Sequence, residues 1–243
     1  MLKNFLSDNF RLSADQIFDS LLSEELSTLI GFGVSHKYKK GEILFREGGI
    51  PTGIFYLESG KVKKYKTTVR GDEQIFFLCS NGELLGYHAL LSEEYYSDTA
   101  ATIEDSQLTF IPKENFLKVL GSSVVLSNWL LKALGHEFGV FVNNFTNLAT
   151  KTVRERLAWN LLILDEKFKN KETVNLPSEI ILSRTDLSNI IGTAKETLVR
   201  LLKEFKMAGL IETKGRSIRL LDKKRLVKEA NPMGNPSRKA VKG

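Results

Sequence analysis

One stretch constrains the fold of this chain more than any other, residues Thr185–Gly209, TDLSNIIGTAKETLVRLLKEFKMAG. Its apolar spacing predicts two short helices joined by a tight turn at Gly192-Thr193, the second helix running from Ala194 to about Met207. The residues assigned to the buried side recur at three- and four-residue spacing: Leu187, Ile190, Ile191, Leu198, Leu201, Leu202 and Phe205. A short helix that presents its polar start after a glycine turn has the shape that a DNA major groove accepts.

Capping boxes are predicted at the starts of both helices, where a hydroxyl residue precedes an acidic residue by three positions. These pairs are Ser183 with Asp186 and Thr193 with Glu196. In each, the hydroxyl accepts from a free backbone N–H and the carboxylate reaches back. A hairpin follows over Leu210–Leu221, LIETKGRSIRLL, and is predicted to form a wing that turns at Lys214-Gly215.

Charge is divided unevenly along the chain. Residues 1–150 carry 14 Lys and Arg against 18 Asp and Glu, whereas residues 151–243 carry 21 against 11, of 35 and 29 in all. A basic C-terminal half indicates that this half alone faces a polyanion. Charge by itself also fits a solvated basic surface, but with the helix pair it favours double-stranded DNA as the partner.

Short β-runs separated by glycines occupy residues 34–111. The breaks recur about every ten residues, as in a sandwich or barrel, at Gly41, Gly48-Gly49, Gly60, Gly71 and Gly82. In KVKKYKTTV, residues 61–69, the lysines alternate with Val62, Tyr65 and Thr67, so we expect the lysines on a solvent face. A helical pattern over residues 12–31 precedes the β-runs.

A long helix is predicted from about Ser122 to Thr150. Apolar residues at alternating three- and four-residue steps form a heptad seam, which is apolar at seven of these eight positions: Val124, Ser127, Leu131, Leu134, Phe138, Phe141, Phe145 and Leu148. We favour a homodimer seam, with Leu131 to Leu148 as its centre, over packing against the chain's own β-domain. A helix over Lys151–Phe168 and two short strands around Pro177 follow, and the basic tail from residue 223 is interpreted as flexible.

Several classes of protein are disfavoured by composition. No run of eighteen apolar residues exists, and the N-terminus lacks the apolar core of a signal peptide, so no membrane contact and a cytoplasmic location are expected. The single cysteine, Cys79, excludes a disulfide and an all-cysteine iron–sulfur cluster within one chain. The three histidines do not have the spacing of metal ligands, and the sequence shows no nucleophile–base pair. We therefore expect neither a metal site nor an enzyme.

Residues 14–222 resemble the Crp/Fnr superfamily of bacterial transcription regulators. The resemblance rests on RTDLSNIIGTAKETLVRLLKEFKMAGLI with the GRSIRL wing, and on GEILFREGG, IFYLESGKVKKY and GELLGYHALL in the same order. It implies an α+β fold with an N-terminal antiparallel β-roll of the cyclic-nucleotide-binding type, a long central dimerisation helix and a C-terminal winged helix-turn-helix. The implied boundaries are 1–121 for the β-roll, 122–150 for the helix, 151–222 for the DNA-binding domain and 223–243 for the tail.

The resemblance also implies which residues read DNA. The family reads its half-site with a Glu and an Arg spaced E-x-x-x-R, matched by Glu196 and Arg200. Arginine donates to guanine O6 and N7, and glutamate accepts from cytosine N4. Lys195 replaces the arginine of the members that bind cyclic AMP and is expected to hold phosphate or to read less strictly. Val199 either touches a thymine methyl or packs internally. Phosphate contacts are expected from Ser183, Arg184, Thr193, Lys214 and Arg216.

In the regulatory half, the resemblance places an effector pocket at six residues: Tyr87, His88, Ser97, Asp98, Phe141 and Val142. An aspartate at residue 98, where the family's cyclic phosphate sits, would repel it with no arginine nearby, so cyclic AMP is not the expected effector. Carbon-monoxide-sensing relatives bind haem through a Cys and a His, but Gly86 stands at the cysteine place beside His88, which disfavours haem and leaves no predicted cofactor. Cys79 is expected to be a small buried hydrophobe, with redox sensing as the lesser alternative.

The resulting hypothesis is a homodimeric, sequence-specific regulator that binds an inverted repeat and is controlled by an unidentified effector. The resemblance adds RNA polymerase as a possible partner. One alternative is a regulator that needs no ligand. Another is a β-roll module that signals through protein partners and binds DNA only non-specifically, which predicts equal affinity for random and promoter sequences.

Overall fold

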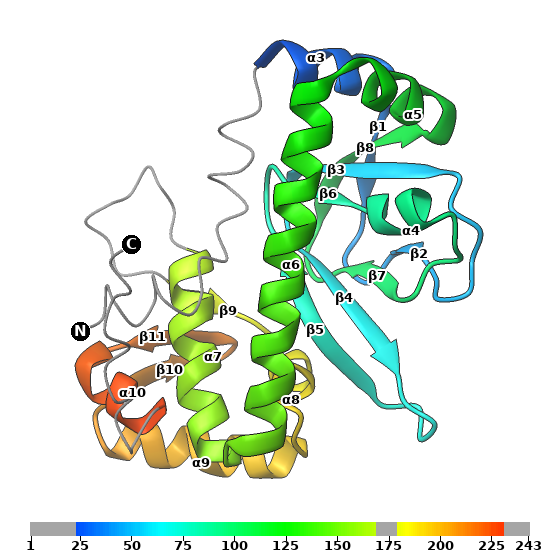
Figure 1. The fold of residues 1–243 in the computed structure, drawn as a ribbon. Helices are drawn as coiled ribbons and strands as arrows, with labels where there is room; N and C mark the ends of the chain where they lie inside the picture. Colours follow the sequence, from blue (N-terminus) through cyan, green and yellow to red (C-terminus); the bar gives the residue numbers. More distant parts are fainter. Residues whose placement is uncertain (1–22, 169–178, 231–243) are drawn as a thin grey trace, which may run out of the picture. The chain divides into compact units, whose positions relative to one another are not determined.

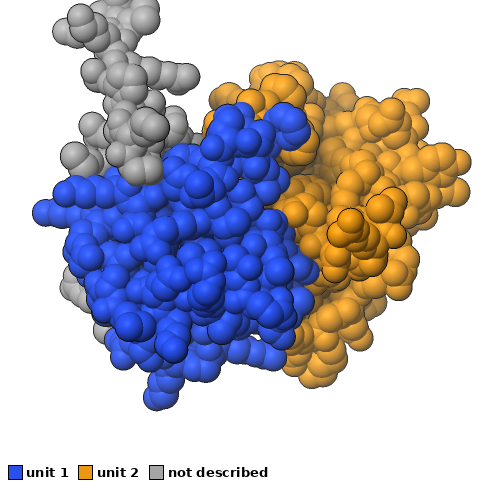
Figure 2. All heavy atoms as spheres, turned by 90° about the horizontal axis from the view of Figure 1, so that it is seen from below, with its two compact units in different colours: residues 1–11, 145–243 blue, residues 12–144 orange. Residues whose placement is uncertain are grey.

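The computed structural model describes residues 23–168 and 179–230. The chain divides into two compact units, residues 12–144 and residues 145–243 with 1–11, which Figure 2 colours separately. Figure 1 labels the helices and strands of the described residues. The long helix α6, Val124–Thr150, belongs mostly to the first unit and ends in the second. Each unit is described by itself below.

The first unit is a β-roll of two four-stranded antiparallel sheets, in the orders β1-β8-β3-β6 and β2-β7-β4-β5. Its strands are β1 (Val34–Tyr38), β2 (Ile43–Phe45), β3 (Gly53–Ser59), β4 (Val62–Thr67), β5 (Glu73–Cys79), β6 (Leu84–Leu85), β7 (Thr99–Thr102) and β8 (Ser106–Pro112). The glycine breaks are the corners. At Gly60, for example, φ is +101° and an added Cβ would lie 2.2 Å from the hydroxyl of Ser106. The predicted antiparallel β-roll is confirmed.

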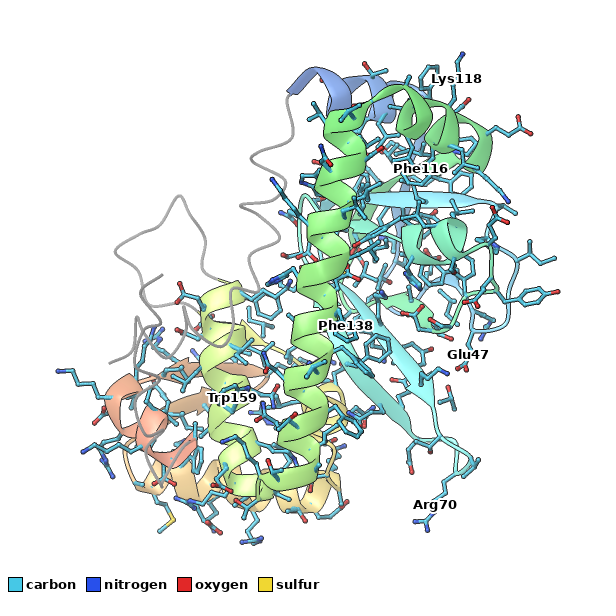
Figure 3. All side chains as sticks on the ribbon, in the orientation of Figure 1. Glu47, Arg70, Phe116, Lys118, Phe138 and Trp159 are labelled. Carbon is cyan, nitrogen blue, oxygen red and sulfur yellow. The ribbon has the colours of Figure 1, made fainter. Side chains whose placement is uncertain are left out.

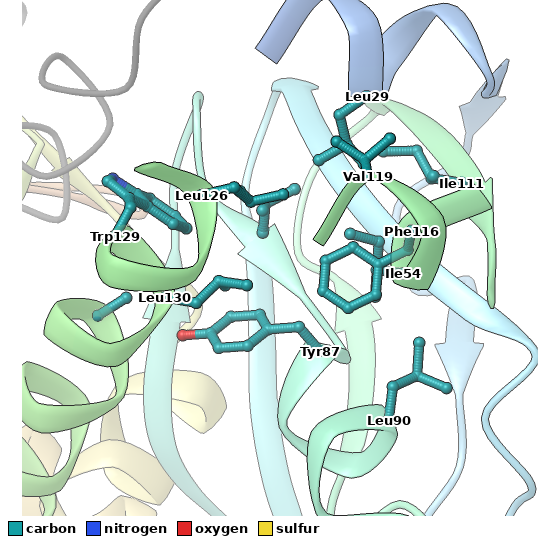
Figure 4. Packing of buried hydrophobic residues seen from close by; sticks show 12 residues of the cluster. Leu29, Ile54, Tyr87, Leu90, Ile111, Phe116, Val119, Leu126, Trp129 and Leu130 are labelled. Atoms are coloured by element: carbon teal, nitrogen blue, oxygen red, sulfur yellow. The ribbon is translucent and has the colours of Figure 1, made fainter. Parts of the chain in front are cut away.

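Helices close the β-roll around an apolar core. They are α3 (Ser23–Gly31), α4 (Tyr87–Ser92), α5 (Lys113–Ser122) and α6. Leu126, Trp129 and Leu130 on one face of α6 pack with Phe116 of α5 and Ile54 of β3 in this core (Figure 4). Among the described residues, no single helix is long and apolar enough to cross a membrane. In this part of the chain, the one pair with the length and composition of a membrane span is α5 with α6, and these two helices are bent by 108° relative to each other.

Two sequence expectations in this unit need correction. The run ELLGYHALL forms the two-residue strand β6 and then the helix α4, because Gly86 turns the chain at φ 84° and the next residues bury Tyr87 and Leu90 at helical spacing. The expected solvent face of β4 is wrong at Lys64, which is only 7% exposed, whereas Lys66 is exposed. A register shift between Lys64 and Tyr65 places both of these neighbouring residues inward, where strict alternation would separate them.

The second unit is a winged helix-turn-helix followed by one more helix. Its elements after α6 are α7 (Val153–Lys167), β9 (Ile180–Ile181), α8 (Arg184–Ile191), α9 (Lys195–Met207), β10 (Ile211–Lys214), β11 (Ser217–Leu220) and α10 (Lys223–Ala230). The wing sheet is antiparallel in the order β10-β11-β9, and β11 extends from the predicted hairpin to pair with β9. Residues 12–22 of the expected first helix and the strand expected before Pro177 lie outside the described residues.

The expectation of a flexible tail from residue 223 is wrong for residues 223–230. These residues form α10, whose Leu226, Val227 and Ala230 are buried. The Lys151 ammonium donates to the Ala230 carbonyl at 2.8 Å, and Lys223 forms an ion pair with the buried Asp165 of α7. The tail was misjudged because its apolar residues are few, although all of them lie on one face.

Candidate DNA interface

The helix pair α8–α9 is built around a glycine turn. Gly192 ends α8 with φ 69° and ψ 56°, a left-handed conformation that glycine adopts without steric cost. Leu187 and Ile191 of α8 and Leu198 and Phe205 of α9 are buried, so the apolar stripes of both helices face inward as expected. The opposite side of α9 carries polar residues together with Val199.

Of the two capping boxes expected here, one is present in part and the other is absent. Ser183 is the N-cap of α8, and its hydroxyl accepts from the Asp186 N–H at 2.9 Å. The N-cap of α9 is Ala194, with no side-chain capping bond, so the Thr193–Glu196 box is wrong. Thr193 lies one residue too early because its own N–H is used by the Ser188 carbonyl at the end of α8, 3.1 Å away.

The predicted base-reading residues lie together on the exposed side of α9. Lys195, Glu196 and Arg200 are exposed, and Val199 is 48% exposed and thus outside the core. Arg200 Nη1 donates to Glu204 Oε1 one turn further along, at 2.7 Å. Positive, negative and apolar groups are therefore available along one helix face, as direct readout of base edges requires.

The expected phosphate-binding residues divide into exposed and engaged groups. Lys214 and Arg216 are exposed at the tip of the wing. Arg184 is half-buried, where desolvation lowers its pKa, and its Nη2 donates to the Gly215 carbonyl at 2.8 Å. Thr193 and Ser183 are also half-buried, Ser183 as a helix cap. Arg184 thus fixes the wing turn against the start of α8 and has less freedom to reach phosphate than the lysine and arginine of the wing.

Arg156 of α7, whose role the sequence analysis did not predict, donates hydrogen bonds to three backbone carbonyls. Its Nε donates to Ile191 O at 2.8 Å, its Nη2 to Gly192 O at 3.0 Å and its Nη1 to Lys151 O at 2.8 Å. The first two are carbonyls at the C-terminus of α8, where a helix lacks internal donors and favours a cation. No local pattern marks such a residue, because its partners lie 35 and 36 residues away in sequence.

A second missed feature, the capping box of α7, was readable in the sequence. The Thr152 hydroxyl accepts from the Glu155 N–H, and the Glu155 carboxylate accepts from the Thr152 N–H at 2.7 Å. The Thr-x-x-Glu spacing is the standard signal for such a cap. Together with Arg156, this cap fixes the start of α7 next to the helix pair.

In the β-roll, a buried charge cluster occupies the region expected to bind an effector. Lys64 Nζ lies 3.3 Å from Asp98 Oδ2, and His88 Nε2 lies 3.3 Å from Asp98 Oδ1. Lys64 pairs with Ala100 across the β4–β7 ladder, so Asp98, two residues earlier, is its diagonal neighbour. The Asp98 residue is 1% exposed. The sequence analysis expected an aspartate here with no arginine nearby; in the structure its cationic partner is Lys64, with His88 on the other oxygen.

The surroundings favour the charged forms of Asp98 and Lys64. Burial raises the pKa of Asp98, but His88 and Lys64 outweigh that effect and hold the pKa below its usual value. Burial lowers the pKa of Lys64, but Asp98 and Glu137 outweigh it and raise the pKa above the usual value. The Tyr87 hydroxyl donates to Glu137 Oε1 of α6 at 2.6 Å, and burial with this carboxylate raises the pKa of Tyr87.

Four of the six residues expected in the effector pocket are thus found in this part of the β-roll, Tyr87 and His88 of α4 with Ser97 and Asp98 before β7. The Ser97 hydroxyl lies 3.5 Å from His88 Nε2. Phe141 and Val142 are 57% and 43% exposed on α6 and stand outside the buried cluster. Cys79 is 2% exposed within an apolar cluster. Among residues 23–168 and 179–230, no group of three or more His, Cys, Asp or Glu is arranged to hold a metal ion.

The heptad seam lies on the exposed side of α6. Leu131 is 66% exposed, Phe138 70%, Phe145 66% and Leu148 42%, whereas Leu134 is partly buried against the core. Phe138 is labelled on α6 in Figure 3, which also marks Arg70 in the turn of the β4–β5 hairpin. Large apolar side chains in a row on a charged protein's surface are typical of an interaction site.

Comparisons with known proteins agree with this architecture. Residues 35–123 match the family model of the cyclic nucleotide-binding domain, and residues 155–229 match that of the Crp-like helix-turn-helix domain. The chain is similar to the transcriptional activator protein FnrA of Stutzerimonas stutzeri, with 30% identity over 184 residues that cover 76% of this chain and 75% of the relative. It is 29% identical to the electron transport regulator A of Shewanella oneidensis over 184 residues, which cover 76% and 73% of the two chains. Its fold resembles that of FixK2 from Bradyrhizobium japonicum, with a TM-score of 0.70, 24% identity and coverage of 81% and 96%.

Proposed function

The chain belongs to the Crp/Fnr superfamily of transcription regulators, and from this premise we propose that it is a homodimer that binds an inverted repeat and reads it with Glu196 and Arg200. The relatives are regulators and not enzymes. The finer proposal concerns which residues read the bases, how the two copies pair and what controls the β-roll.

The observation that carries the proposal is the exposed face of α9. Glu196 and Arg200 are one helical turn apart on the side opposite the buried leucines, so both are directed to the same face. An arginine there can donate two hydrogen bonds, to guanine O6 and N7, while a glutamate accepts one from cytosine N4. Lys195 at the start of α9 and Lys214 and Arg216 on the wing supply cations for flanking phosphates.

Pairing of two copies through α6 is supported by the exposed seam. Leu131, Phe138 and Phe145 recur seven residues apart and are at least 66% exposed. A strict seven-residue repeat favours a second helix with the same repeat. Because two-fold symmetry of the protein is mirrored in its site, the expected target is an inverted repeat with half-sites about one helical turn, ~34 Å, apart.

An effector of the β-roll, if one binds, is proposed to be something other than cyclic AMP. A cyclic phosphate would have to displace Asp98 from Lys64 and would meet the aspartate's charge. Haem binding would have to take His88 from Asp98. The iron–sulfur chemistry of some relatives does not fit either, because the sequence holds one cysteine and it is buried in an apolar cluster. A regulator without a ligand is the second candidate, favoured by this internal pairing of the charges.

The readout is tested by selecting operators from random-sequence duplexes with the wild-type protein, then measuring binding of Arg200→Ala. The variant is expected to lose about 5- to 150-fold in preference for the selected G·C pair, because a bidentate contact is worth about 1–3 kcal/mol. Arg216→Ala is the matched control, and should weaken binding to all sequences alike and lower the salt slope by about 1. If selection yields no preferred sequence, the β-roll module with non-specific DNA affinity is favoured instead. Sedimentation at the mass of one 27.4 kDa chain would contradict the homodimer.

A further inference from the structure

Arg200 is the first of four charged side chains in the second unit that form a series, each in contact with the next. Its Nη1 donates to Glu204 Oε1 at 2.7 Å, and Glu204 Oε2 accepts from Arg154 Nη1 at 2.9 Å. Arg154 Nε in turn donates to Glu229 Oε2 at 2.7 Å. The charges alternate in sign, and the contacts lead from the exposed face of α9 to α7 and α10.

Arg154, the third member of this series, is fixed to the core. The Arg154 guanidinium lies 4.8 Å from the centre of the Phe205 ring, and Phe205 is fully buried. A guanidinium that stacks on an aromatic face and pairs with two carboxylates has little rotational freedom. Glu204, held by Arg154 through one oxygen, therefore presents its other oxygen at a defined place on α9.

The contact to Glu204 leaves the recognition edge of Arg200 available. Among the described residues Glu204 is the partner of the Arg200 guanidinium, and it uses Nη1. The Nε and Nη2 groups form the other edge of the planar fork, and their two parallel N–H bonds suit guanine O6 and N7. One side of the guanidinium is thus anchored while the opposite side remains able to read a base.

We infer that Glu204 is a positioning residue, anchored by Arg154, that orients Arg200 for guanine recognition. This inference rests on the proposed readout by Arg200. An exposed arginine loses rotamer freedom on binding, and orientation before binding reduces that loss. Because Glu204 is negative, it also repels DNA in general, so its role is measured by discrimination between sequences and not by affinity alone.

The experiment compares binding of full-length variants to the selected operator and to the same duplex with the read G·C pair replaced by A·T. Glu204→Ala is expected to lower the discrimination between the two duplexes by about three- to ten-fold. Glu204→Gln, which keeps an oxygen acceptor, should restore part of it. Glu212→Ala is the matched control, because it removes an exposed carboxylate of the wing that pairs with Arg219 and leaves the discrimination unchanged.

The double variant Arg200→Ala with Glu204→Ala decides whether Glu204 acts through Arg200. Its discrimination should equal that of Arg200→Ala alone. Additive losses in the double variant would overturn the inference, as would a Glu204→Ala protein that binds both duplexes more tightly by the same factor. If Arg200→Ala itself leaves discrimination unchanged, the proposed function fails and not only this inference.

Discussion

The two units each contain a set of paired charges, and the two sets differ mainly in their access to water. In the β-roll, the side chains of Lys64 and Asp98 are 9% and 2% exposed. In the winged helix, Arg200 and Glu204 are 65% and 39% exposed. Buried ions depend on each other, because neither retains its hydration. Exposed ions keep most of theirs, so their pairing contributes little to folding and can serve to orient a side chain.

This difference indicates what each set of charges is for. Lys64 and Asp98 are buried as a pair in the β-roll beside His88, and breaking this pair should affect folding. The series from Arg200 to Glu229 lies on the reading unit, and breaking it should affect selection of DNA with little change in folding. The following predictions test this contrast from the largest expected effect to the smallest.

The largest effect is expected for Lys64→Met, which leaves Asp98 buried without its lysine. The free energy of unfolding of the β-roll should fall by about 3–5 kcal/mol. Trp159→Phe provides a background in which Trp129 of the β-roll core is the remaining tryptophan, so its fluorescence during urea unfolding reports on this unit. The double variant Lys64→Met with Asp98→Leu should recover most of the loss, because no unpaired ion is left. A loss below about 1 kcal/mol would show that the pair is hydrated, and the contrast would fail.

Acid should produce a smaller loss in the same unit. The pKa of Asp98 is held below its ordinary value of 3.8, so its ionised form stabilises the fold above that pH. This stabilisation is lost as the pH falls through the lowered pKa. Lys64, whose pKa is raised, stays charged over this range, and Glu137 and His88 are the other ionisable groups beside the pair. The loss is smaller than for Lys64→Met, because protonation neutralises Asp98, whereas Lys64→Met leaves a buried carboxylate ion without its lysine. Urea unfolding between pH 5 and about 2 should show a steeper decline for the wild type than for the double variant Lys64→Met with Asp98→Leu. Equal slopes would contradict the role of Asp98.

The smallest effect on folding is expected in the winged helix, for Arg154→Ala. The side chain is 38% exposed, so loss of its two ion pairs and its packing on Phe205 should cost only about 1 kcal/mol. The measurement uses Trp159 as reporter in a Trp129→Phe background. Arg200→Ala, at the more exposed end of the same series, is the control and should change the unfolding free energy by less than about 0.5 kcal/mol. A cost of several kcal/mol for either variant would remove the distinction between the two units.

Sequence reasoning succeeded where the signal is local. The glycine corners, the helix pair around Gly192 and the repeat of α6 depend on spacing within a few residues, and the structure has all three. It failed at α9, where the assignment of Thr193 as a cap was off by one residue, because Thr193 was already bonded to Ser188. The spacing of a cap is visible in sequence, but competition for the same N–H is not.

The buried charges show a different limit. Lys64 was expected on a solvent face because lysines alternate along the strand, yet a bulge and a diagonal aspartate bring it inside. The sequence analysis looked for an arginine near Asp98 and did not identify Lys64 as its partner, because Lys64 lies far earlier in the sequence on another strand. Arg154 and Glu204 are likewise 50 residues apart. Such pairs follow from strand register and helix packing, which spacing alone does not specify.

The three carbonyl contacts of Arg156 have a practical consequence for anyone who joins this reading unit to another sensor. Arg156 ties the Lys151 carbonyl, just after α6, to the end of α8, and the Lys151 ammonium reaches Ala230 in α10. A fusion junction placed before Lys151 and after Ala230 would transfer the whole set of bonds intact. A junction between Lys151 and Arg156 would remove Lys151 and leave the Ala230 carbonyl at the end of α10 without this donor, whereas Arg156 would keep the Ile191 and Gly192 carbonyls. A transferred reading unit that keeps all of these bonds therefore has to begin no later than Lys151 and to include α10.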